Sequence, residues 1–251
     1  MKFSIITVCY NSEGTIEECL RSVEDQSYSD IEHIIVDGGS TDRTVDIIRN
    51  FSRGKNNIIW KSDEDEGIYD AMNIGIDMSS GDIISILNSD DKLASNEIIS
   101  RVSRSFLQCR DIDAVLTGIE FVNEGNKRTR RVRANLFNPS RLAYGWMPPH
   151  PGMFLRRSVY SQVGKYAIDY RIAADYEFCV RAFLQHAVSF MVIDFISVQM
   201  RPGGVSTSGF GSTITITREI VRACRENNIV PNMPLLIFRL PIKWVLSVLR
   251  R

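Results

Sequence analysis

Two clusters of acidic and small polar residues each follow a short apolar run of strand length. They are residues 36–42 (VDGGSTD) and residues 87–91 (LNSDD). Ligands of open α/β sheets bind at the carboxyl ends of the strands. A hard divalent cation takes oxygen ligands and usually shares its shell with substrate phosphates, so one or two carboxylates suffice to hold it. The spacing therefore predicts a site for a cation and a phosphorylated ligand that includes Asp37, Asp90 and Asp91.

Each cluster taken alone has a simpler interpretation as a turn followed by a helix N-cap. Asp, Asn, Gly and Ser favour turns whether or not they bind a ligand. Ser40 or Thr41 could cap a helix that begins near residue 43. Two such clusters in one chain, together with further motifs along the sequence, favour the binding site over the plain turn.

The segments that must position these clusters alternate between strands and helices. Apolar runs predict strands at 3–9, 31–36, 57–60 and 82–87, and amphipathic segments predict helices at 15–23 and 68–78. This alternation predicts a mostly parallel sheet covered on both faces. After residue 91 the pattern changes to a helix at 96–107, a hairpin formed by 114–122 and the basic run 127–133, a Pro-rich stretch at 147–152, a helix at 173–185 and a strand at 188–198.

Composition limits the class of protein. The chain has 251 residues, 44% of them hydrophobic, which is enough for one large domain or a domain with a small extension. The formal net charge is zero, which argues against a nucleic-acid binder that neutralises phosphates. The five cysteines include no C-x-x-C pair and indicate reduced thiols. No signal-peptide pattern opens the sequence, so we expect a cytoplasmic protein.

A dinucleotide-binding oxidoreductase is one alternative, with Asp37 as the ribose ligand at the end of the second strand. That fold needs a glycine-rich turn after its first strand so that the backbone can approach the pyrophosphate. Residues 9–14 (CYNSEG) contain one glycine, and no G-x-x-x-x-G-K phosphate loop precedes a predicted helix. Both nucleotide-binding motifs are therefore excluded.

Several ordered segments resemble the family 2 inverting glycosyltransferases of the GT-A fold, and the resemblance extends over about residues 3–205. The segments are 4–11 (SIITVCYN), 36–42, 65–75 (DEGIYDAMNIG), 87–91, 150–154 (HPGMF) and 174–178 (ADYEF). The resemblance implies a Rossmann-like α/β fold with a mixed, mostly parallel sheet. It also implies a GT-A domain at 1–210, with a nucleotide-sugar half at 1–91 and an acceptor half at 92–210, followed by a helical extension at 211–251.

The same resemblance implies roles for individual residues. Those expected to bind the nucleotide-sugar donor are Thr7, Tyr10, Asn11, Glu13, Asp37, Asp65, Gly67, Asn73, Asn88, Ser89 and Arg201. Asp90 ends the segment at the family's D-x-D position and is the expected ligand of Mn²⁺ or Mg²⁺. Asp91 is the alternative metal ligand. Asn88 departs from that pattern by replacing its first aspartate, although its amide can still hydrogen-bond sugar hydroxyls.

Asp175 is the carboxylate that the resemblance implies as the base for the acceptor hydroxyl. Asp169 or Glu177 could take that role instead, and Asp175 would then be an aspartate favoured by the helix macrodipole. His150 could contact metal or acceptor, but a lone histidine is more often a packed residue. The Q-x-x-R-W motif of processive members is missing, so we expect the transfer of a single sugar.

The sequence from Pro234 onward (PLLIFRLPIKWVLSVLRR) is too short and too charged to span a bilayer. On a helix, Arg239, Lys243 and Arg250 lie on one side, which is typical of an interfacial helix on anionic lipid. The alternative is a helix that docks on the domain or forms a homodimer. The basic run 127–133 could also contact lipid or diphosphate, or be a solvated hairpin face.

Two functions follow as hypotheses. The first is a metal-dependent inverting transferase that moves a hexosyl or N-acetylhexosaminyl group from a nucleotide sugar, with UDP favoured, to a saccharide or lipid-linked acceptor. It would act in bacterial surface-polysaccharide synthesis (O-antigen, lipopolysaccharide, capsule or exopolysaccharide), as a peripheral protein on the cytoplasmic face of the inner membrane. The second is a catalytically silent sugar-nucleotide-binding or scaffold subunit. The intact Asp37, Asp90 and Asp175 favour the first.

Overall fold

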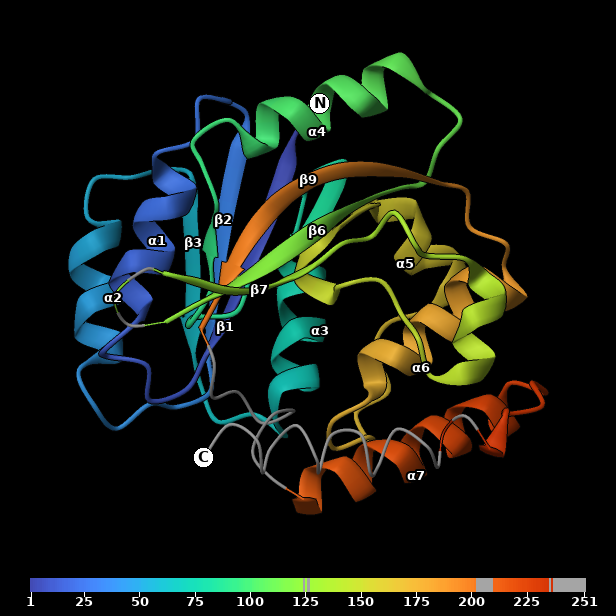
Figure 1. The fold of residues 1–251 in the computed structure, drawn as a ribbon. Helices are drawn as coiled ribbons and strands as arrows, with labels where there is room; N and C mark the ends of the chain where they lie inside the picture. Colours follow the sequence, from blue (N-terminus) through green and yellow to red (C-terminus); the bar gives the residue numbers. More distant parts are fainter. Residues whose placement is uncertain (124, 126, 202–209, 235, 237–251) are drawn as a thin grey trace.

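The computed structural model describes residues 1–123, 125, 127–201, 210–234 and 236, and its centre is a nine-stranded sheet (Figure 1). The strands are β1 Phe3–Cys9, β2 Ile31–Asp37, β3 Ile58–Ser62, β4 Ile83–Ile86, β5 Lys92–Leu93, β6 Ala114–Val122, β7 Arg128–Val132, β8 Met153–Arg156 and β9 Phe190–Met200. Their order is β3-β2-β1-β4-β8-β6-β9-β5, and β7 pairs with β6 beside this path. The predicted hairpin is confirmed as the antiparallel pair of β6 and β7.

Helices cover both faces of the sheet. They are α1 Ile16–Glu24, α2 Thr44–Ser52, α3 Ile68–Met78, α4 Ile98–Gln108, α5 Arg157–Val163, α6 Ala174–Val180 and α7 Phe210–Glu226, with short turns η1 Pro139–Tyr144, η2 His150–Gly152 and η3 Arg181–Gln185. Figure 1 shows α1 and α2 on one side of the parallel strands and α3 on the other. None of the helices in the described ranges is long and apolar enough to cross a bilayer.

The parallel part of the sheet is buried on both faces. In β1, Ile6 and Val8 pack towards α3, whereas Phe3 and Ile5 pack towards α1 and α4. Successive side chains of a strand point to opposite faces, so this run is apolar on both sides. β1 runs parallel to β2 and β4, and β2 to β3, so their carboxyl ends meet at one edge. The predicted mixed α/β sheet is confirmed, with its acidic clusters at that edge.

Three features differ from the sequence-based expectation. The two-residue β5 pairs with β9, and the turn η1 follows β7; neither was predicted. The helix expected at 173–185 divides into α6 and the π-helical turn η3. The interfacial helix expected from Pro234 onward falls almost wholly outside the described residues, where only Pro234 and the buried Leu236 belong to that segment.

Candidate active site

The loop after β1 is tied to the loop after β2 by Asn11 and Glu13. The Asn11 N–H donates to Ser40 Oγ (2.8 Å), and Asn11 Oδ1 accepts from the Thr41 N–H (2.9 Å). Asn11 has a φ of 47°, a left-handed conformation that asparagine tolerates well. Glu13 Oε2 accepts from the N–H of Arg43, the residue before α2 (3.1 Å). These two side chains therefore shape the carboxyl edge of the sheet by fixing its loops.

Asp37 ends β2 and is fully buried. Its Oδ2 accepts hydrogen bonds from the Ser40 N–H (2.9 Å) and the Ser62 hydroxyl (2.7 Å), and its Oδ1 accepts from Ser40 Oγ (2.5 Å). The carboxylate is thereby held by donors from the loop after β2 and from the end of β3. Asp37 is therefore a rigid element of the edge.

Asp65 lies directly against the turn that follows Asp37. A Cβ at Gly38 would come within 2.5 Å of Asp65 Oδ2, so a larger residue there would displace the Asp65 carboxylate. Asp65 Oδ1 accepts from the N–H of Gly67 (2.8 Å), whose φ of 116° also favours glycine. Burial raises the pKa of Asp65, and the neighbouring Asp70 carboxylate acts in the same direction. The edge thus brings Asp65 next to the first acidic cluster.

The second cluster contains buried oxygen atoms that lack partners. Ser89 joins the cluster to the β1–α1 loop through a hydroxyl contact with Ser12 (2.8 Å). Asn88 Oδ1 and both carboxylate oxygens of Asp91 are buried and accept no hydrogen bond of good geometry from a described residue. The Asn88 side chain and the Arg201 backbone still lie close enough to Asp91 to favour its charged form. Leaving a buried polar group unmatched costs about 1–3 kcal/mol. Such orphaned acceptors indicate a bound group that the protein chain does not itself supply.

A small cavity of about 10 Å³ lies beside these oxygens, with room for about one water molecule or ion. Its lining includes Asp90, Asp91, Lys92 and Arg201. Burial raises the pKa of Asp90, which the Arg201 cation opposes. Burial raises the pKa of Asp91 well above its usual range, and Asp90 adds to that effect. Both cations of the lining, Lys92 and Arg201, form ion pairs with Glu18 at the rim.

The donor set fits a hard divalent cation with an incomplete protein shell. Asp90, Asp91 and Asn88 supply oxygen atoms only, which suit Mg²⁺ or Mn²⁺. Within the described part of the chain, no three His, Cys, Asp or Glu side chains are grouped so as to hold a metal ion. A cation bound there would have its shell completed by groups from outside these side chains, such as water or phosphate oxygens.

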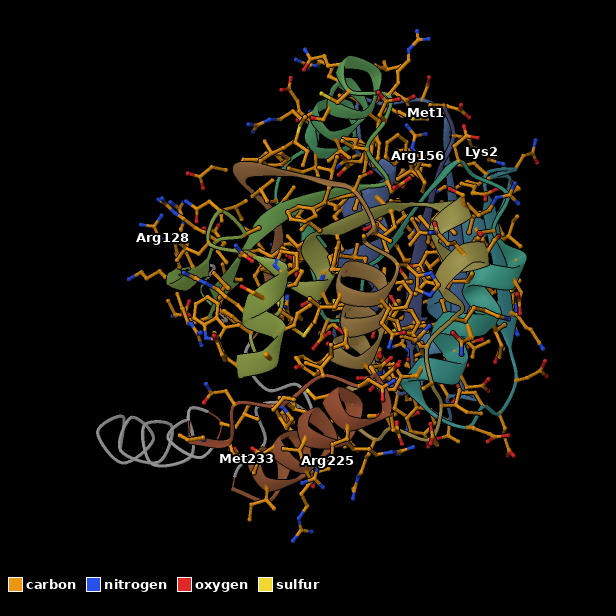
Figure 2. The ribbon with its side chains drawn as sticks, turned by 90° about the vertical axis from the view of Figure 1, so that its right-hand side faces the viewer. Met1, Lys2, Arg128, Arg156, Arg225 and Met233 are labelled. Atoms are coloured by element: carbon orange, nitrogen blue, oxygen red, sulfur yellow. The ribbon has the colours of Figure 1, made fainter. Side chains whose placement is uncertain are left out.

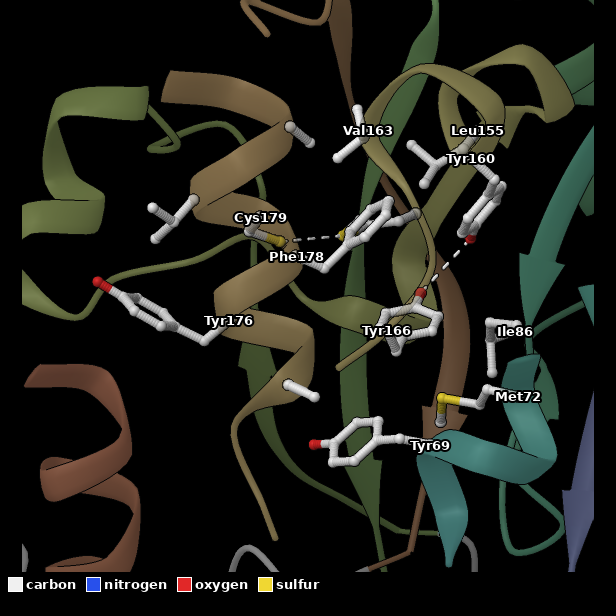
Figure 3. Packing of buried hydrophobic residues seen from close by; sticks show 14 of the residues in the cluster. Tyr69, Met72, Ile86, Leu155, Tyr160, Val163, Tyr166, Tyr176, Phe178 and Cys179 are labelled. Carbon is white, nitrogen blue, oxygen red and sulfur yellow. Dashed lines mark hydrogen bonds between the residues drawn. The ribbon is translucent and has the colours of Figure 1, made fainter. Parts of the chain in front are cut away.

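Asp175 lies in the first turn of α6. Figure 3 shows the Tyr69 side chain of α3 beside the segment that leads into that helix. The Tyr69 hydroxyl donates to the carbonyl of Ile172 (2.5 Å) and lies 3.5 Å from Asp175 Oδ1, which also accepts from the Tyr176 N–H (2.8 Å). Burial raises the pKa of Asp175 to about 6, and these hydrogen bonds limit the rise. A carboxyl group with this pKa is ionised at neutral pH and can still accept a proton.

The two carboxylates that sequence reasoning left as alternatives are both neutralised by arginine. Asp169 is exposed and forms an ion pair with Arg222, which lowers the pKa of Asp169. Glu177 is buried and pairs with Arg181, at 2.7 Å from its Nε. Asp175 has no cationic partner among the residues described. Of the three, its environment is the one suited to proton transfer.

A glutamate of α7 fixes the segment that leads into α6. Glu219 Oε1 accepts from the Arg171 N–H (2.8 Å), and its Oε2 accepts from the N–H groups of Ile172 (3.0 Å) and Ala173 (2.8 Å). These donors lie at the start of α6, where backbone N–H groups have no partners within the helix. Glu219 therefore positions the turn that carries Asp175.

Replacing Glu219 with alanine removes these three bonds, and we expect the protein to lose about 1–2 kcal/mol of stability, the usual cost of a lost helix cap. For a chain of this length, that loss corresponds to a decrease of roughly 2–8 °C in Tm. Thermal unfolding followed by circular dichroism measures it. Glu97→Ala is the matched control, because the exposed Glu97 side chain makes no hydrogen bond to a described residue. Equal Tm values for the two variants would contradict the capping role.

Three further candidate residues have internal partners. Thr7 is fully buried with its hydroxyl 2.9 Å from His33 Nε2, so it has no surface for contact with a donor, and we leave it out of the proposed donor site. The Asn73 side chain exchanges hydrogen bonds with the backbone N–H (3.0 Å) and carbonyl (2.8 Å) of Tyr166. His150 Nε2 lies 2.8 Å from the Tyr166 hydroxyl, and burial lowers the pKa of His150 to about 4.

Sequence reasoning missed the tyrosines that lie between α3 and α6. Figure 3 shows Tyr69 and Tyr166 between α3 and α6, with ring centres 6.0 Å apart, and Tyr166 packs on Phe178 at 4.9 Å. Tyr69 belongs to the segment 65–75 that was singled out, so its place in that motif could have identified it. Glu219 lies in no motif, and the sequence offered no signal for it.

An α/β sheet with two acidic loops at its parallel edge, and a carboxylate of raised pKa on a later helix, is the architecture of the GT-A glycosyltransferase fold. Two solved structures support this class. S. aureus TarS 1–349 in complex with UDP-GlcNAc aligns over 88% of this chain and 67% of its own, with a TM-score of 0.65 and 22% identity. The mannosyltransferase PcManGT from Pyrobaculum calidifontis, in complex with GDP-Man and Mn²⁺, aligns over 95% and 69%, with a TM-score of 0.66 and 16% identity.

Sequence comparison gives the family. The model of Glycosyl transferase family 2 matches residues 4–164. A PGL/p-HBAD biosynthesis glycosyltransferase from Mycobacterium bovis (strain BCG / Pasteur 1173P2) is 34% identical over 188 residues, which are 74% of this chain and 71% of the relative. An uncharacterized glycosyltransferase from Mycobacterium tuberculosis (strain CDC 1551 / Oshkosh) is 34% identical over 72% of this chain and 68% of its own. The chain therefore belongs to glycosyl transferase family 2 and is a glycosyltransferase.

Proposed function

We propose that this glycosyltransferase moves a single sugar, with inversion, from a nucleoside diphosphate sugar to a hydroxyl group of a saccharide or lipid-linked acceptor. The observation that carries the proposal is the set of unpartnered buried oxygens of Asn88 and Asp91 beside Asp90, at the edge that also holds Asp37. These oxygen atoms could coordinate a cation that is also bound to the phosphates of a ligand. A nucleoside diphosphate sugar with Mn²⁺ or Mg²⁺ has that chemistry.

The donor would lie along the carboxyl ends of β1, β2 and β4. Tyr10 is 63% exposed just after β1 and offers a ring for packing against the base. Asp65 and the backbone around Gly67 would border the ribose, and Asn88 and Ser89 would face the sugar and diphosphate. UDP is our first choice of nucleotide. One structural neighbour is in complex with UDP-GlcNAc and another with GDP-Man, so a donor screen must include both bases.

Asp175 is the proposed base of the reaction. The acceptor hydroxyl attacks the anomeric carbon as the bond between that carbon and the diphosphate oxygen breaks, and its proton passes to an Asp175 carboxylate oxygen. Attack from the face opposite the leaving group inverts the configuration without a covalent enzyme intermediate. When bound at Asp90, the divalent cation supplies Lewis-acid stabilisation of the charge on the leaving diphosphate. Arg201, at the cavity, adds a fixed positive charge close to the same group.

For the acceptor, we favour a glycolipid or lipid-linked saccharide of a surface polymer. The support is a relative that is named for PGL/p-HBAD biosynthesis, together with the amphipathic pattern of the sequence after Pro234. The sugar is proposed to be a hexosyl or N-acetylhexosaminyl group, added once. The competing proposal, a silent sugar-nucleotide-binding subunit, is disfavoured because Asp175 has the pKa of a working base and no neutralising partner in the described structure.

The purified protein incubated with a panel of UDP- and GDP-sugars, with Mn²⁺, Mg²⁺ or EDTA, tests the proposal. We expect metal-dependent release of the nucleoside diphosphate from one donor, by slow hydrolysis without acceptor and faster with it. A protein that binds a donor but releases no nucleotide with any acceptor tested would support the silent subunit. A protein that binds no nucleotide sugar would contradict both proposals.

The sequence after Leu236 is proposed to hold the enzyme at the cytoplasmic face of the inner membrane. Leu236 is 1% exposed and packs in the core of the domain, so a truncation that removes residues 237–251 leaves that contact in place. We expect the truncated chain to shift from membrane to soluble fractions, because apolar burial and attraction to anionic lipid are both lost. Donor hydrolysis should be retained. If the truncated chain instead changes only its oligomeric state, the segment forms a homodimer contact.

A further inference from the structure

Glycosyl transfer does not explain a group of large side chains exposed at η1 and after α7. Tyr144 is 38% exposed and Trp146 is 49% exposed, while Val230 and Met233 are 86% and 38% exposed. Single exposed apolar residues need no explanation. An exposed tryptophan and tyrosine together are characteristic of surfaces with one apolar and one wet side.

The backbone brings η1 and the chain after α7 together. The Asn232 N–H donates to the carbonyl of Ala143 (2.9 Å), so the chain after α7 lies against η1. Met233 in turn lines an open groove of about 580 Å³ along α7. The other residues of its lining are Thr217, Arg218, Val221, Arg222, Arg225 and Glu226. Figure 2 shows Met233 and Arg225 at the same lower side of the molecule. We call the surface formed by Arg141, Tyr144, Trp146, Arg218, Val221, Arg225, Val230 and Met233 the α7 patch.

The charge of the α7 patch is positive. Arg218 and Arg225 are exposed and have no acidic partner among the described residues, and Arg141 lies over the Trp146 ring at 5.8 Å. Nearby, the positive charge of Arg222 is already shared between Asp169 and Glu226. Long arginine side chains can cover apolar surface with their stems and keep the guanidinium at a polar boundary.

We propose that the α7 patch is a contact surface for an anionic lipid membrane, separate from the sequence after Leu236. The aromatic and aliphatic side chains of the patch match the acyl boundary of such a membrane. The surrounding arginines without acidic partners match its negatively charged headgroups. A protein partner of the same shape would need acidic groups placed opposite each arginine. A lipid surface supplies negative charge at every position. The acid in the groove lining, Glu226, is already paired with Arg222, so Arg218 and Arg225 are left for the anionic headgroups, which favours lipid.

The position of the α7 patch also determines how close Asp175 would lie to the membrane. This step alone rests on the proposed function. The opposite side of α7 presents Glu219 to residues 171–173, directly before Asp175. Membrane contact through the outer side of α7 therefore places the proposed base one helix away from the lipid surface. A short lipid-linked acceptor can reach it there without leaving the membrane.

Binding of the full chain to phosphatidylcholine vesicles, with and without phosphatidylglycerol, tests the lipid contact. Each arginine near an anionic surface changes binding by about fivefold, so Arg218→Gln with Arg225→Gln should weaken binding to the anionic vesicles by about 25-fold. The matched control is Arg53→Gln with Arg110→Gln, which removes two exposed arginines outside the α7 patch. Equal binding of the patch variant and the wild type overturns the proposal, and so does equal weakening in both variants.

The environment of Trp146 gives an independent measurement. The chain has three tryptophans, so Trp60→Phe with Trp244→Phe leaves Trp146 as the single reporter. We expect its fluorescence to shift to the blue on anionic vesicles and to be quenched by brominated acyl chains. Unchanged emission with vesicles that bind the protein overturns the proposal. A blue shift that depends on protein concentration without vesicles also overturns it, because the surface would then be a contact between two copies of the chain.

Discussion

Replacing Asp175 by asparagine should lower kcat by on the order of 10²–10⁴-fold, the usual effect of losing a general base. Asparagine keeps the size of the side chain and an oxygen that can accept from the Tyr176 N–H, but it cannot take a proton. Proton removal assists only the transition state, so the loss should fall on kcat and leave donor affinity nearly unchanged. Steady-state kinetics with donor binding by calorimetry separates the two.

Asp169→Asn is the matched control for that experiment. Asp169 is six residues before Asp175, exposed, and engaged with Arg222, so its loss should leave turnover close to normal. Near-normal turnover of Asp175→Asn together with a large loss in Asp169→Asn would transfer the base role to Asp169. A large loss in both variants with weakened donor binding would indicate damage to the structure rather than to the chemistry.

The pH profile should carry the signature of the same group. Burial raises the pKa of Asp175 to about 6, and only the ionised carboxylate can act as a base. We therefore expect kcat/KM, which reports ionisations of the free enzyme, to fall by about tenfold per pH unit below pH 6 and to be flat above it. In Asp175→Asn the acid limb near pH 6 should vanish from the residual activity. A wild-type profile that stays flat down to pH 4.5 would exclude Asp175 as the base.

The sequence was most informative where chemistry and periodicity coincide. The acidic clusters follow apolar runs, and the parallel order of β1, β2 and β4 brings their carboxyl ends to one edge. Any α/β arrangement of these strands gives that result, so the place of Asp37 and Asp90 could be predicted. A glycine-rich phosphate turn could be excluded for an equally local reason, because residues 9–14 contain a single glycine.

Predictions were weaker where a side chain finds its partner far along the chain. Thr7 looked like a donor residue because it is polar and near the end of a strand, but its partner His33 comes from the neighbouring strand. Both faces of β1 are buried, so strand periodicity cannot separate a site residue from a core residue there. Glu219 is similar, since its backbone partners lie 46 to 48 residues earlier.

Asn11 and Glu13 show a third kind of limit. Both lie at the predicted edge, yet their side chains accept hydrogen bonds from the backbone of the neighbouring loop. Residue type and position are the same for a side chain that binds a ligand and for one that builds the loop around it. Only the hydrogen-bond partners distinguish the two roles, and these come from residues about 30 positions away.

Replacing Asp90 by alanine should reduce transfer by on the order of 10³-fold or more, because electrostatic stabilisation of the leaving diphosphate is lost. The fold should be retained, since Asp90 lies in the loop between β4 and β5 and lines the small cavity. Circular dichroism and thermal unfolding check that the variant is folded. Asp111→Ala is the matched control, because Asp111 is an exposed carboxylate far along the chain from the cluster.

Binding of UDP with and without Mn²⁺ measures the cation site apart from activity. For the wild type, calorimetry should show much tighter UDP binding with Mn²⁺ than with EDTA, because the nucleotide phosphates complete the shell of a cation held at Asp90. In Asp90→Ala this difference should largely disappear, while binding in EDTA stays close to the wild-type value. An unchanged Mn²⁺ dependence in Asp90→Ala, but a lost one in Asp91→Ala, would move the cation to the deeper carboxylate. Unchanged dependence in both variants would remove the cation from this cluster altogether.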